Sequence, residues 1–151
     1  MTAPASLAIR SEAHPVYESK TMKFGYTIAY VPDVAASLAF FGRAFDLSTR
    51  FLHESGTYGE LETGETVLAF ASEDLAAMNF PAGHISAHSS KLPLGMEIAL
   101  VTDTVEAAHA KALVAGASEL AAPAQKPWGQ IVSYVRCPAG IVVELCTPVA
   151  S

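Results

Sequence analysis

One short sequence pattern occurs twice in this chain of 151 residues, and it constrains the fold more than any other feature. Residues 26–37 read YTIAYVPDVAAS, and residues 96–107 read MEIALVTDTVEA. Aligning Asp33 with Asp103, an offset of 70 residues, also superimposes the Ile-Ala pair and the following Val of the two copies. Each copy is an apolar run typical of a strand that leads into an aspartate able to cap a helix. The repeat predicts two similar modules in one domain, with a binding site where they meet.

Composition and charge narrow the class of protein. Hydrophobic residues make up 51% of the chain and charged residues only 16%, which favours sheets with two buried faces, an apolar cavity or a subunit interface. A net charge of −6 argues against nucleic-acid binding, because phosphate contacts need an excess of Lys and Arg. It is compatible with a cationic ligand.

Nothing in the sequence indicates a membrane or a secretory protein. No apolar run approaches the roughly 20 residues that a membrane-spanning helix needs. The first ten residues lack the basic start and long apolar stretch of a signal peptide. Cys137 and Cys146 flank an expected hairpin, and we interpret them as free thiols in a reducing cytoplasm.

The first module is expected over residues 23–71. A strand at 23–31 is followed by Asp33 and by a helix at 34–45, where large apolar residues recur at helical spacing. Three further strands are expected between turns at glycines, at residues 47–54, 57–62 and 66–71.

A connector and an arm lie outside the modules. Residues 1–22 are weakly patterned and form an N-terminal arm. Residues 72–93 form a connector with one short helix near 73–78, and its length makes it a candidate binding lid or crossover between modules.

The second module, over residues 94–147, repeats the order. A strand at 95–101 leads to Asp103, which caps a helix that ends at Gly116. Residues 121–128 contain two prolines and are expected to form a loop. The expected strands of this module's second half are residues 118–121, 129–136 and 141–146.

The order of several short motifs resembles one known superfamily. Residues 31–41 read VPDVAASLAFF, similar to a family opening of the form V-x-D-x-x-x-S-x-x-F-Y. AGA at 115–117, PWG at 127–129 and PAGIVVEL at 138–145 follow in the family's order, with Cys137 in place of the usual Asp. Over about residues 23–147 the chain resembles the vicinal-oxygen-chelate superfamily of glyoxalases, bleomycin-resistance proteins and dioxygenases.

This resemblance implies an α+β fold in which two βαβββ modules with mixed sheets curl around a shared cleft. It also implies that metal-dependent members place up to four ligands on the first and fourth strands of the modules. The corresponding positions here are Tyr26, Leu68, Met96 and Glu144.

Only Glu144 among those positions keeps the chemistry of a metal ligand. A catalytic divalent ion normally takes three protein ligands, so we predict no metal and no other cofactor. A shift of the mapping by one residue would bring in Glu97, but strand alternation is then expected to point that side chain to the other face.

Histidines offer weak alternatives for a metal site. His53 lies on an expected strand and could face the cleft. His84 and His88 are four residues apart in the connector, where we interpret them as lid residues. His109 is expected on the surface of a helix, and His14 lies in the arm.

Aromatic and apolar residues dominate the expected cleft. Alternation gives Tyr26 and Tyr30 one parity on the first strand, and Leu68 and Phe70 one parity on the fourth. If both sets face the cleft, it suits an organic ligand; otherwise they simply fill the space. Trp128 is either a stacking wall or a core plug.

Glu144 also has two interpretations. It is either a partly solvated carboxylate, bonded to Tyr26 or Tyr134, or an anion that awaits a cation or an N–H group of a ligand.

We therefore predict a metal-independent small-molecule binding protein of the bleomycin-resistance type, cytoplasmic and homodimeric, that sequesters an organic ligand, with a cationic ligand compatible with its charge. The alternative is a lyase, isomerase or dioxygenase with a divalent metal (Zn, Ni, Mn or Fe) at a degenerate site that includes Glu144 and His53. A third hypothesis is a scaffold that has lost catalysis and serves structural or regulatory ends. The predicted ligand-binding residues are Tyr26, Tyr30, His53, Phe70, Trp128 and Glu144.

Overall fold

The structure, a computed structural model, describes residues 21–149. Nearly all of the predicted N-terminal arm (1–22) lies outside the described residues. The chain divides into two compact units: one takes residues up to Leu38 together with Ser48–His84, and the other takes Ala39–Leu47 together with residues from Ile85 onward. Within residues 21–149, every helix is too short or too polar to cross a membrane.

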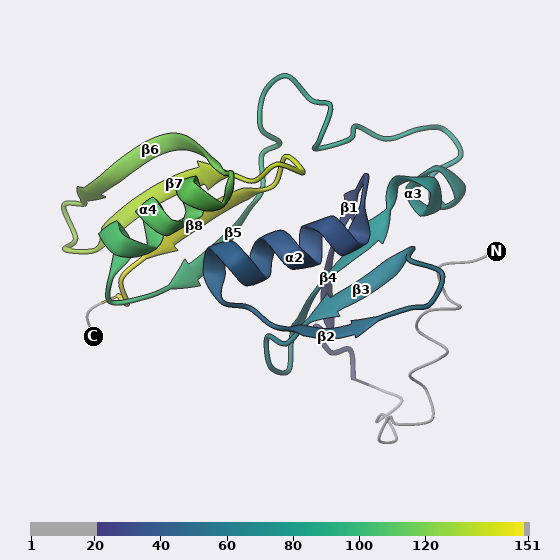
Figure 1. Cartoon of the computed structure of the whole chain (residues 1–151), viewed down its shortest axis with the longest axis horizontal. Coiled ribbons are helices and arrows are strands. Elements are labelled where there is room, and N and C mark those ends of the chain that lie inside the picture. Colours follow the sequence, from purple (N-terminus) through teal and green to yellow (C-terminus); the bar gives the residue numbers. More distant parts are fainter. Residues whose placement is uncertain (1–20, 150–151) are drawn as a thin grey trace. The chain divides into compact units, whose positions relative to one another are not determined.

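The first unit contains a four-stranded mixed sheet in the order β1-β4-β3-β2 (Figure 1). β1 pairs with β4 in parallel, and the other pairs are antiparallel. The predicted strands and the short connector helix are confirmed. Their bounds are β1 Tyr26–Val31, β2 Thr49–Leu52, β3 Tyr58–Leu61, β4 Val67–Ser72 and α3 Glu73–Asn79.

Helix α2 (Val34–Phe45) begins as predicted, because the Asp33 carboxylate accepts a hydrogen bond from the backbone N–H of Ala36 at 3.0 Å. The start of the helix packs closely on the sheet at Gly59. A Cβ on that glycine would lie 2.7 Å from Leu38 Cδ1 and 3.2 Å from Val34 Cγ1. The face that Gly59 presents is therefore the helix-covered face of the first sheet.

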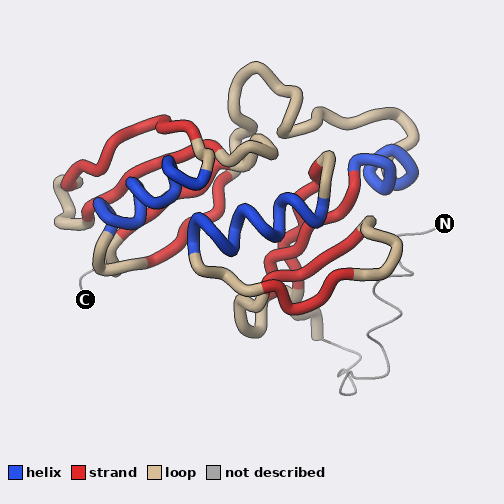
Figure 2. The backbone as a smooth tube through the Cα atoms, viewed as in Figure 1, coloured by secondary structure: helices blue, strands red, loops and turns tan. Residues whose placement is uncertain are grey.

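The second unit repeats this architecture, with strand order β5-β8-β7-β6 and a parallel β5–β8 pair. Helix α4 packs on one face of the sheet against β6, β7 and β8, as Figures 1 and 2 show. The predicted second module is thus confirmed as an α+β unit. Its elements are β5 Glu97–Val101, α4 Val105–Ala115, β6 Ser118–Gln125, β7 Ile131–Arg136 and β8 Val142–Cys146.

The predicted cap of the second helix is wrong by one residue. The N-cap of α4 is Thr104, and it makes no side-chain capping bond, whereas Asp103 was expected there. The predicted end is confirmed, since Gly116 follows the helix with φ of 125°. Because the helices begin at Val34 and Val105, the modules superimpose with an offset of 71 residues, not 70.

The loop predicted at residues 121–128 is wrong over its first half, because β6 continues to Gln125 through Pro123. β6 is the edge strand of its sheet, and Pro123 falls in a stretch without a register partner in β7, so the missing proline N–H costs no ladder hydrogen bond. Its pairing with β7 also shifts register between Glu119 and Ala121 and again between Ala121 and Ala124. Such bulges admit a proline that a central strand would reject.

His109 is buried, with 4% of its surface exposed, so its predicted place on the helix surface is wrong. The ring lies between α4 and the sheet, where Nδ1 is 2.9 Å from Ser133 Oγ and Nε2 is 2.8 Å from Glu119 Oε2. Both partners come from the sheet beneath the helix. These bonds satisfy a polar side chain that would otherwise destabilise an apolar interface.

We expect His109→Ala to lower the free energy of unfolding by about 1–3 kcal/mol, because it leaves buried Ser133 without its histidine partner. Urea unfolding would measure the loss. Val114→Ala is the control, since Val114 is 90% exposed on the same helix. Equal effects of the two substitutions would contradict a stabilising role for the buried network.

Candidate functional site

The strand register of the second sheet brings two carboxyl groups to one face. Glu97 pairs with Val142 and Ala99 pairs with Glu144, so Glu97 and Glu144 are diagonal neighbours across the β5–β8 pair. Tyr134 on β7 is directly opposite Glu144. The next residue back, Ser133, bonds to His109 of α4, so the face that carries Tyr134 is the one turned away from the helix.

The first-strand position of the second module, which was assigned to Met96 from the sequence, is therefore occupied by Glu97. Glu97 opens the β5–β8 register as Tyr26 opens the β1–β4 register, and the offset of 71 residues relates the two. The expectation that Glu97 points away from Glu144 is wrong. The cause is visible at the paired valines of the repeat, since Val31 is fully buried and Val101 is 64% exposed. The two copies match in sequence but face opposite sides of their sheets.

Glu144 is the centre of a small hydrogen-bonded group. Glu144 acts on the protonation of three neighbouring side chains, those of Glu97, Tyr134 and Cys146. The Cys146 thiol itself donates to the carbonyl oxygen of Leu100 at 3.8 Å. Tyr134, one of the two partners predicted for this carboxylate, lies directly opposite it across the β7–β8 pair, and the bond between them stays a prediction.

The same group shifts the pKa values of its members. The hydrogen bond to Glu144, together with partial burial and the Glu144 charge, raises the pKa of Glu97 from 4.5 to about 7. Burial and the two nearby carboxylates raise the pKa of the Tyr134 hydroxyl. Burial and Glu144 also raise the pKa of the Cys146 thiol, which makes it a poor nucleophile. With a pKa of about 7, Glu97 is about half protonated at neutral pH.

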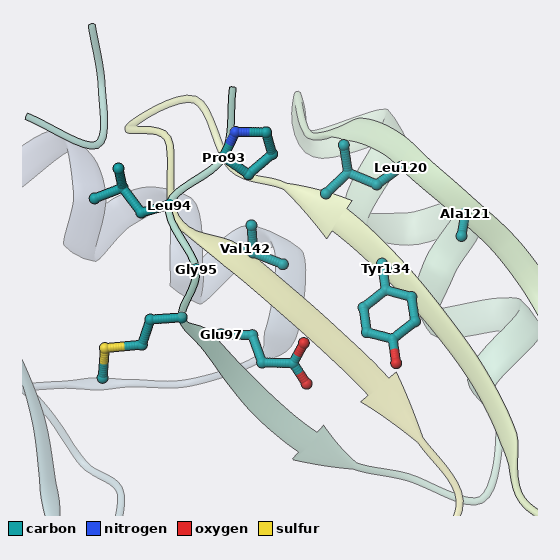
Figure 3. A pocket seen from close by; sticks show the side chains of 9 residues that line it. Pro93, Leu94, Gly95, Glu97, Leu120, Ala121, Tyr134 and Val142 are labelled. Atoms are coloured by element: carbon teal, nitrogen blue, oxygen red, sulfur yellow. The ribbon is translucent and has the colours of Figure 1, made fainter. Parts of the chain in front are cut away.

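An open pocket of about 410 Å³ lies against this group, and Figure 3 shows Glu97 and Tyr134 projecting into it with apolar side chains around them. An apolar wall with a few convergent polar groups is typical of small-molecule sites. The residues that line it are Pro93, Leu94, Gly95, Met96, Glu97, Leu120, Ala121, Tyr134 and Val142.

A bulge in β6 shapes one wall of the pocket. Glu119 pairs with Val135 and Ala121 pairs with Tyr134, so one extra residue, Leu120, is inserted opposite the tyrosine. Bulges re-aim side chains, and here both Leu120 and Ala121 line the pocket. Sequence alternation alone would have assigned these two residues to opposite faces.

The first unit places its predicted site residues differently. Tyr26 and Tyr30 pack against a cluster of buried residues that includes Tyr58, and Asn79 Nδ2 donates to the Tyr30 hydroxyl at 3.1 Å. Phe70 is fully buried and pairs with Gly59, which places it on the face covered by α2. The expectation that Phe70 shares a face with the two tyrosines is therefore wrong.

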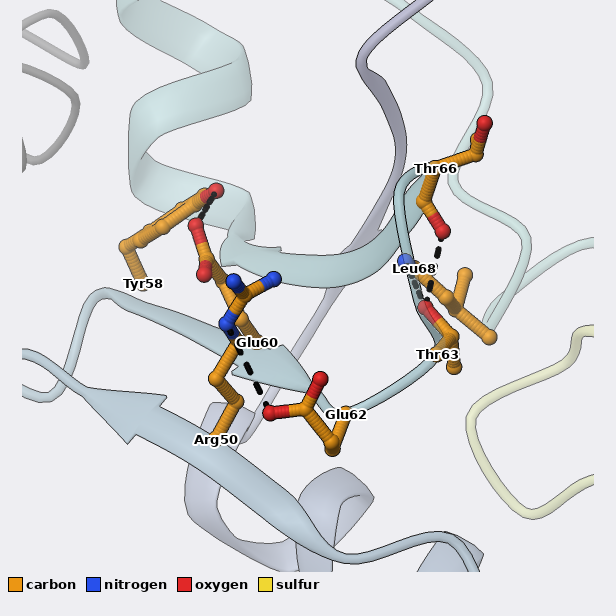
Figure 4. A network of polar contacts seen from close by, with 7 residues as sticks. All are labelled: Arg50, Tyr58, Glu60, Glu62, Thr63, Thr66 and Leu68. Carbon is orange, nitrogen blue, oxygen red and sulfur yellow. Dashed lines mark hydrogen bonds and ion pairs between the residues drawn. The ribbon is translucent and has the colours of Figure 1, made fainter. Parts of the chain in front are cut away.

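A buried carboxyl group also lies on the first sheet. Glu60 has no exposed surface, and its Oε2 accepts a hydrogen bond from the Tyr58 hydroxyl at 2.8 Å (Figure 4). Glu60 pairs with Ala69, so it occupies the same face as Tyr58. Ala69, and not Leu68, is the counterpart of Glu144, because Ile28–Ala69 is the pair equivalent to Ala99–Glu144.

The remaining predicted residues lie in turns and in the connector. His53 follows β2, and its Nδ1 is 2.6 Å from Ser55 Oγ. Trp128 lies in the β6–β7 turn, where its indole N–H donates to Gln130 and 63% of its surface is exposed, so it is not a core plug. In the connector, Nε2 of His84 lies 3.0 Å from Oε1 of Glu73.

The donors within each unit do not suit a catalytic divalent metal. Glu97 and Glu144 supply two carboxylates, whereas three protein ligands are usual. Among residues 21–149, no three or more His, Cys, Asp or Glu side chains are grouped closely enough to hold a metal ion. The prediction that the protein works without a metal stays a prediction.

Comparison with protein families identifies the group to which the chain is related. The model of the Glyoxalase/Bleomycin resistance protein/Dioxygenase superfamily matches residues 23–145. The chain belongs to this superfamily. The resemblance seen in the sequence motifs and the paired βαβββ order are thereby confirmed. A search of curated proteins gives no match.

Solved structures of superfamily proteins share the fold. A glyoxalase-related enzyme from Fulvimarina pelagi matches with a TM-score of 0.71 and 19% identity, over 85% of this chain and 89% of that one. A family enzyme from Burkholderia phytofirmans PsJN matches with a TM-score of 0.68 and 18% identity, over 85% and 100% of the two chains. A third, from Nocardioides, matches with a TM-score of 0.61 and 15% identity, over 96% and 93%. At these identities the likeness extends to the fold alone.

The raised pKa of Glu97 predicts how the stability of the protein depends on pH. Because the folded-state pKa of Glu97 lies above 4.5, folding binds a proton, and the resulting stabilisation is lost as the pH rises from 4.5 through about 7. We expect Glu97→Gln to raise the melting temperature relative to the native protein more at pH 8 than at pH 5. Glu106→Gln, at the exposed start of α4, controls for net charge. If the difference in melting temperature between Glu97→Gln and the native protein is the same at pH 5 and pH 8, the raised pKa of Glu97 is wrong.

Proposed function

We propose that this superfamily member is a small-molecule binding protein that sequesters an organic ligand on the open face of the second sheet. The ligand's apolar body contacts Leu120, Met96 and Val142, which line the pocket. Its cationic or N–H group bonds to Glu144, which neighbours the pocket-lining Glu97 on the same sheet face. The protein acts by stoichiometric binding and uses no metal.

The observation that carries the proposal is the Glu97–Glu144 pair beside an apolar pocket. The two carboxyl groups lie diagonally on one sheet face at the edge of the apolar lining, where a ligand's N–H group can donate to them. A cation that replaces the proton of Glu97 gains a charged partner in Glu144, which is half-buried, so the attraction is stronger there than in water. Tyr134 supplies a further hydroxyl at the same place.

The finer parts of the proposal rest on composition and chemistry. The described cysteines are free and buried, which suits a reducing cytoplasm. The high apolar content supports a homodimer, and a role in antibiotic resistance follows if the ligand is a cationic antibiotic. Of the ligand-binding residues predicted from the sequence, the proposal retains Glu144. It adds Glu97, Tyr134, Leu120, Met96 and Val142.

One observation favours a second candidate, a metal-dependent lyase, isomerase or dioxygenase. Glu97 and Glu144 stand on the first and last strands of their module, where the family resemblance implies metal ligands. The two candidates differ in metal content and in the response to a cationic ligand.

We expect Glu144→Gln to weaken binding of 1-naphthylmethylamine, a cationic aromatic probe, by about ten- to hundredfold. A hydrogen bond to a charged group contributes ~1.5–3 kcal/mol, which corresponds to that factor. The neutral isostere 1-naphthylmethanol should lose little affinity. Naphthalene fluorescence or calorimetry would give both dissociation constants.

Glu62→Gln serves as the control for net charge. Glu62 forms an ion pair with Arg50 in the first unit, and neither residue lines the pocket. The charge-pairing role is wrong if the amine and the alcohol lose affinity equally in Glu144→Gln.

Metal analysis separates the two candidate functions. Protein purified without chelators should contain well under one divalent ion per chain, because the described donors fall short of a three-ligand site. One tightly held ion per chain in the native protein, absent from Glu144→Gln, would favour the metal-dependent enzyme.

A further inference from the structure

Arg136, at the end of β7, holds the connector by its guanidinium group. Its Nη2 donates to the carbonyl oxygens of Ala87 at 2.9 Å and Ser90 at 2.8 Å. Its Nη1 donates to Lys91 O, and its Nε to Gly140 O, both at 3.3 Å. The rigid planar fork of arginine is suited to this work, because it directs five donors at fixed angles.

A glycine lets the connector lie directly on the β7–β8 turn. A Cβ on Gly140 would lie only 2.1 Å from the carbonyl oxygen of Ala87, and the glycine has φ of +96°. Both the space and the backbone conformation therefore require glycine. The segment around Ala87 is held by this close contact as well as by Arg136.

The held segment leads straight into the pocket. A few residues beyond Lys91, the chain forms one wall of the pocket with Pro93, Leu94, Gly95 and Met96 (Figure 3). Arg136 itself pairs with Val142, which also lines the pocket, and lies two residues from Tyr134 on the same face. Arg136 thus connects the strand side of the pocket to the connector side.

We propose that Arg136 is a positioning residue that sets the width of the pocket and, through it, the size of ligand that the protein accepts. It touches no ligand; it fixes the wall at Pro93–Met96 relative to β7 and β8. The proposal about ligand size rests on the proposed function, but the clamp itself does not.

Hydrogen exchange tests the clamp without any ligand. In Arg136→Gln we expect amide exchange in a peptide covering residues 86–96 to accelerate at least tenfold, because the three bonds from Arg136 to carbonyl groups of this segment are lost. Arg136→Lys keeps the charge but not the fork, so its exchange should be intermediate. Arg50→Gln removes an arginine paired with Glu62 on the first sheet and should change nothing in this peptide.

A pair of amines of different size tests the specificity. Benzylamine and 1-naphthylmethylamine share the cationic group and differ only in bulk. We expect Arg136→Gln to shift the ratio of their affinities at least fivefold toward the naphthyl compound, with Arg136→Lys restoring part of the native ratio. A merely stabilising arginine would weaken both amines by the same factor.

The outcomes separate the two proposals. Unchanged exchange in residues 86–96 overturns the clamp, and an unchanged affinity ratio with faster exchange overturns the specificity role. If neither amine binds the native protein, the proposed function fails, while the exchange experiment still decides the clamp. If Arg136→Gln does not fold, Arg136→Lys is read in the same two ways.

Discussion

The parallel pairing of β5 with β8 is the constraint on which the candidate site depends. It joins the first and last strands of the second module, and its register sets Glu97 and Glu144 diagonally on one face. The crossover through α4 covers the other face, which leaves the carboxyl pair open to ligand. The antiparallel β7–β8 pair then adds Tyr134 directly opposite Glu144. Every polar group of the site is therefore positioned by a strand pair and none by a loop alone.

The chemistry of the site follows from this crowding of acids. Two neighbouring carboxyl groups cannot both ionise without cost, and this raises the pKa of Glu97 to about 7. Around them the surface is apolar, supplied by the connector end and by the β6 bulge. A site with an anionic carboxylate and apolar walls is better suited to binding an organic cation than to coordinating a divalent metal ion.

Much of the fold could be predicted from the sequence. The repeat, the helix cap at Asp33, the end of the second helix at Gly116 and the order βαβββ are local signals that the structure confirms. The site was predicted less well: of the six ligand-binding residues predicted from the sequence, only Glu144 lies beside Glu97 and Tyr134 at the pocket. A one-residue error in aligning the repeat selected Met96 instead of Glu97, and in a strand one residue reverses the face.

The sequence by itself determined the modules, because periodic apolar residues and capping residues act over a few neighbours along the chain. Only the tertiary structure decided which face each strand residue takes, that His109 is buried against Ser133 and Glu119, and that β6 carries Pro123 as an edge strand. It also decided that Arg136 reaches the connector. The physical reason is that register, burial and edge position arise from pairing between segments distant in the chain, and no single segment contains that information.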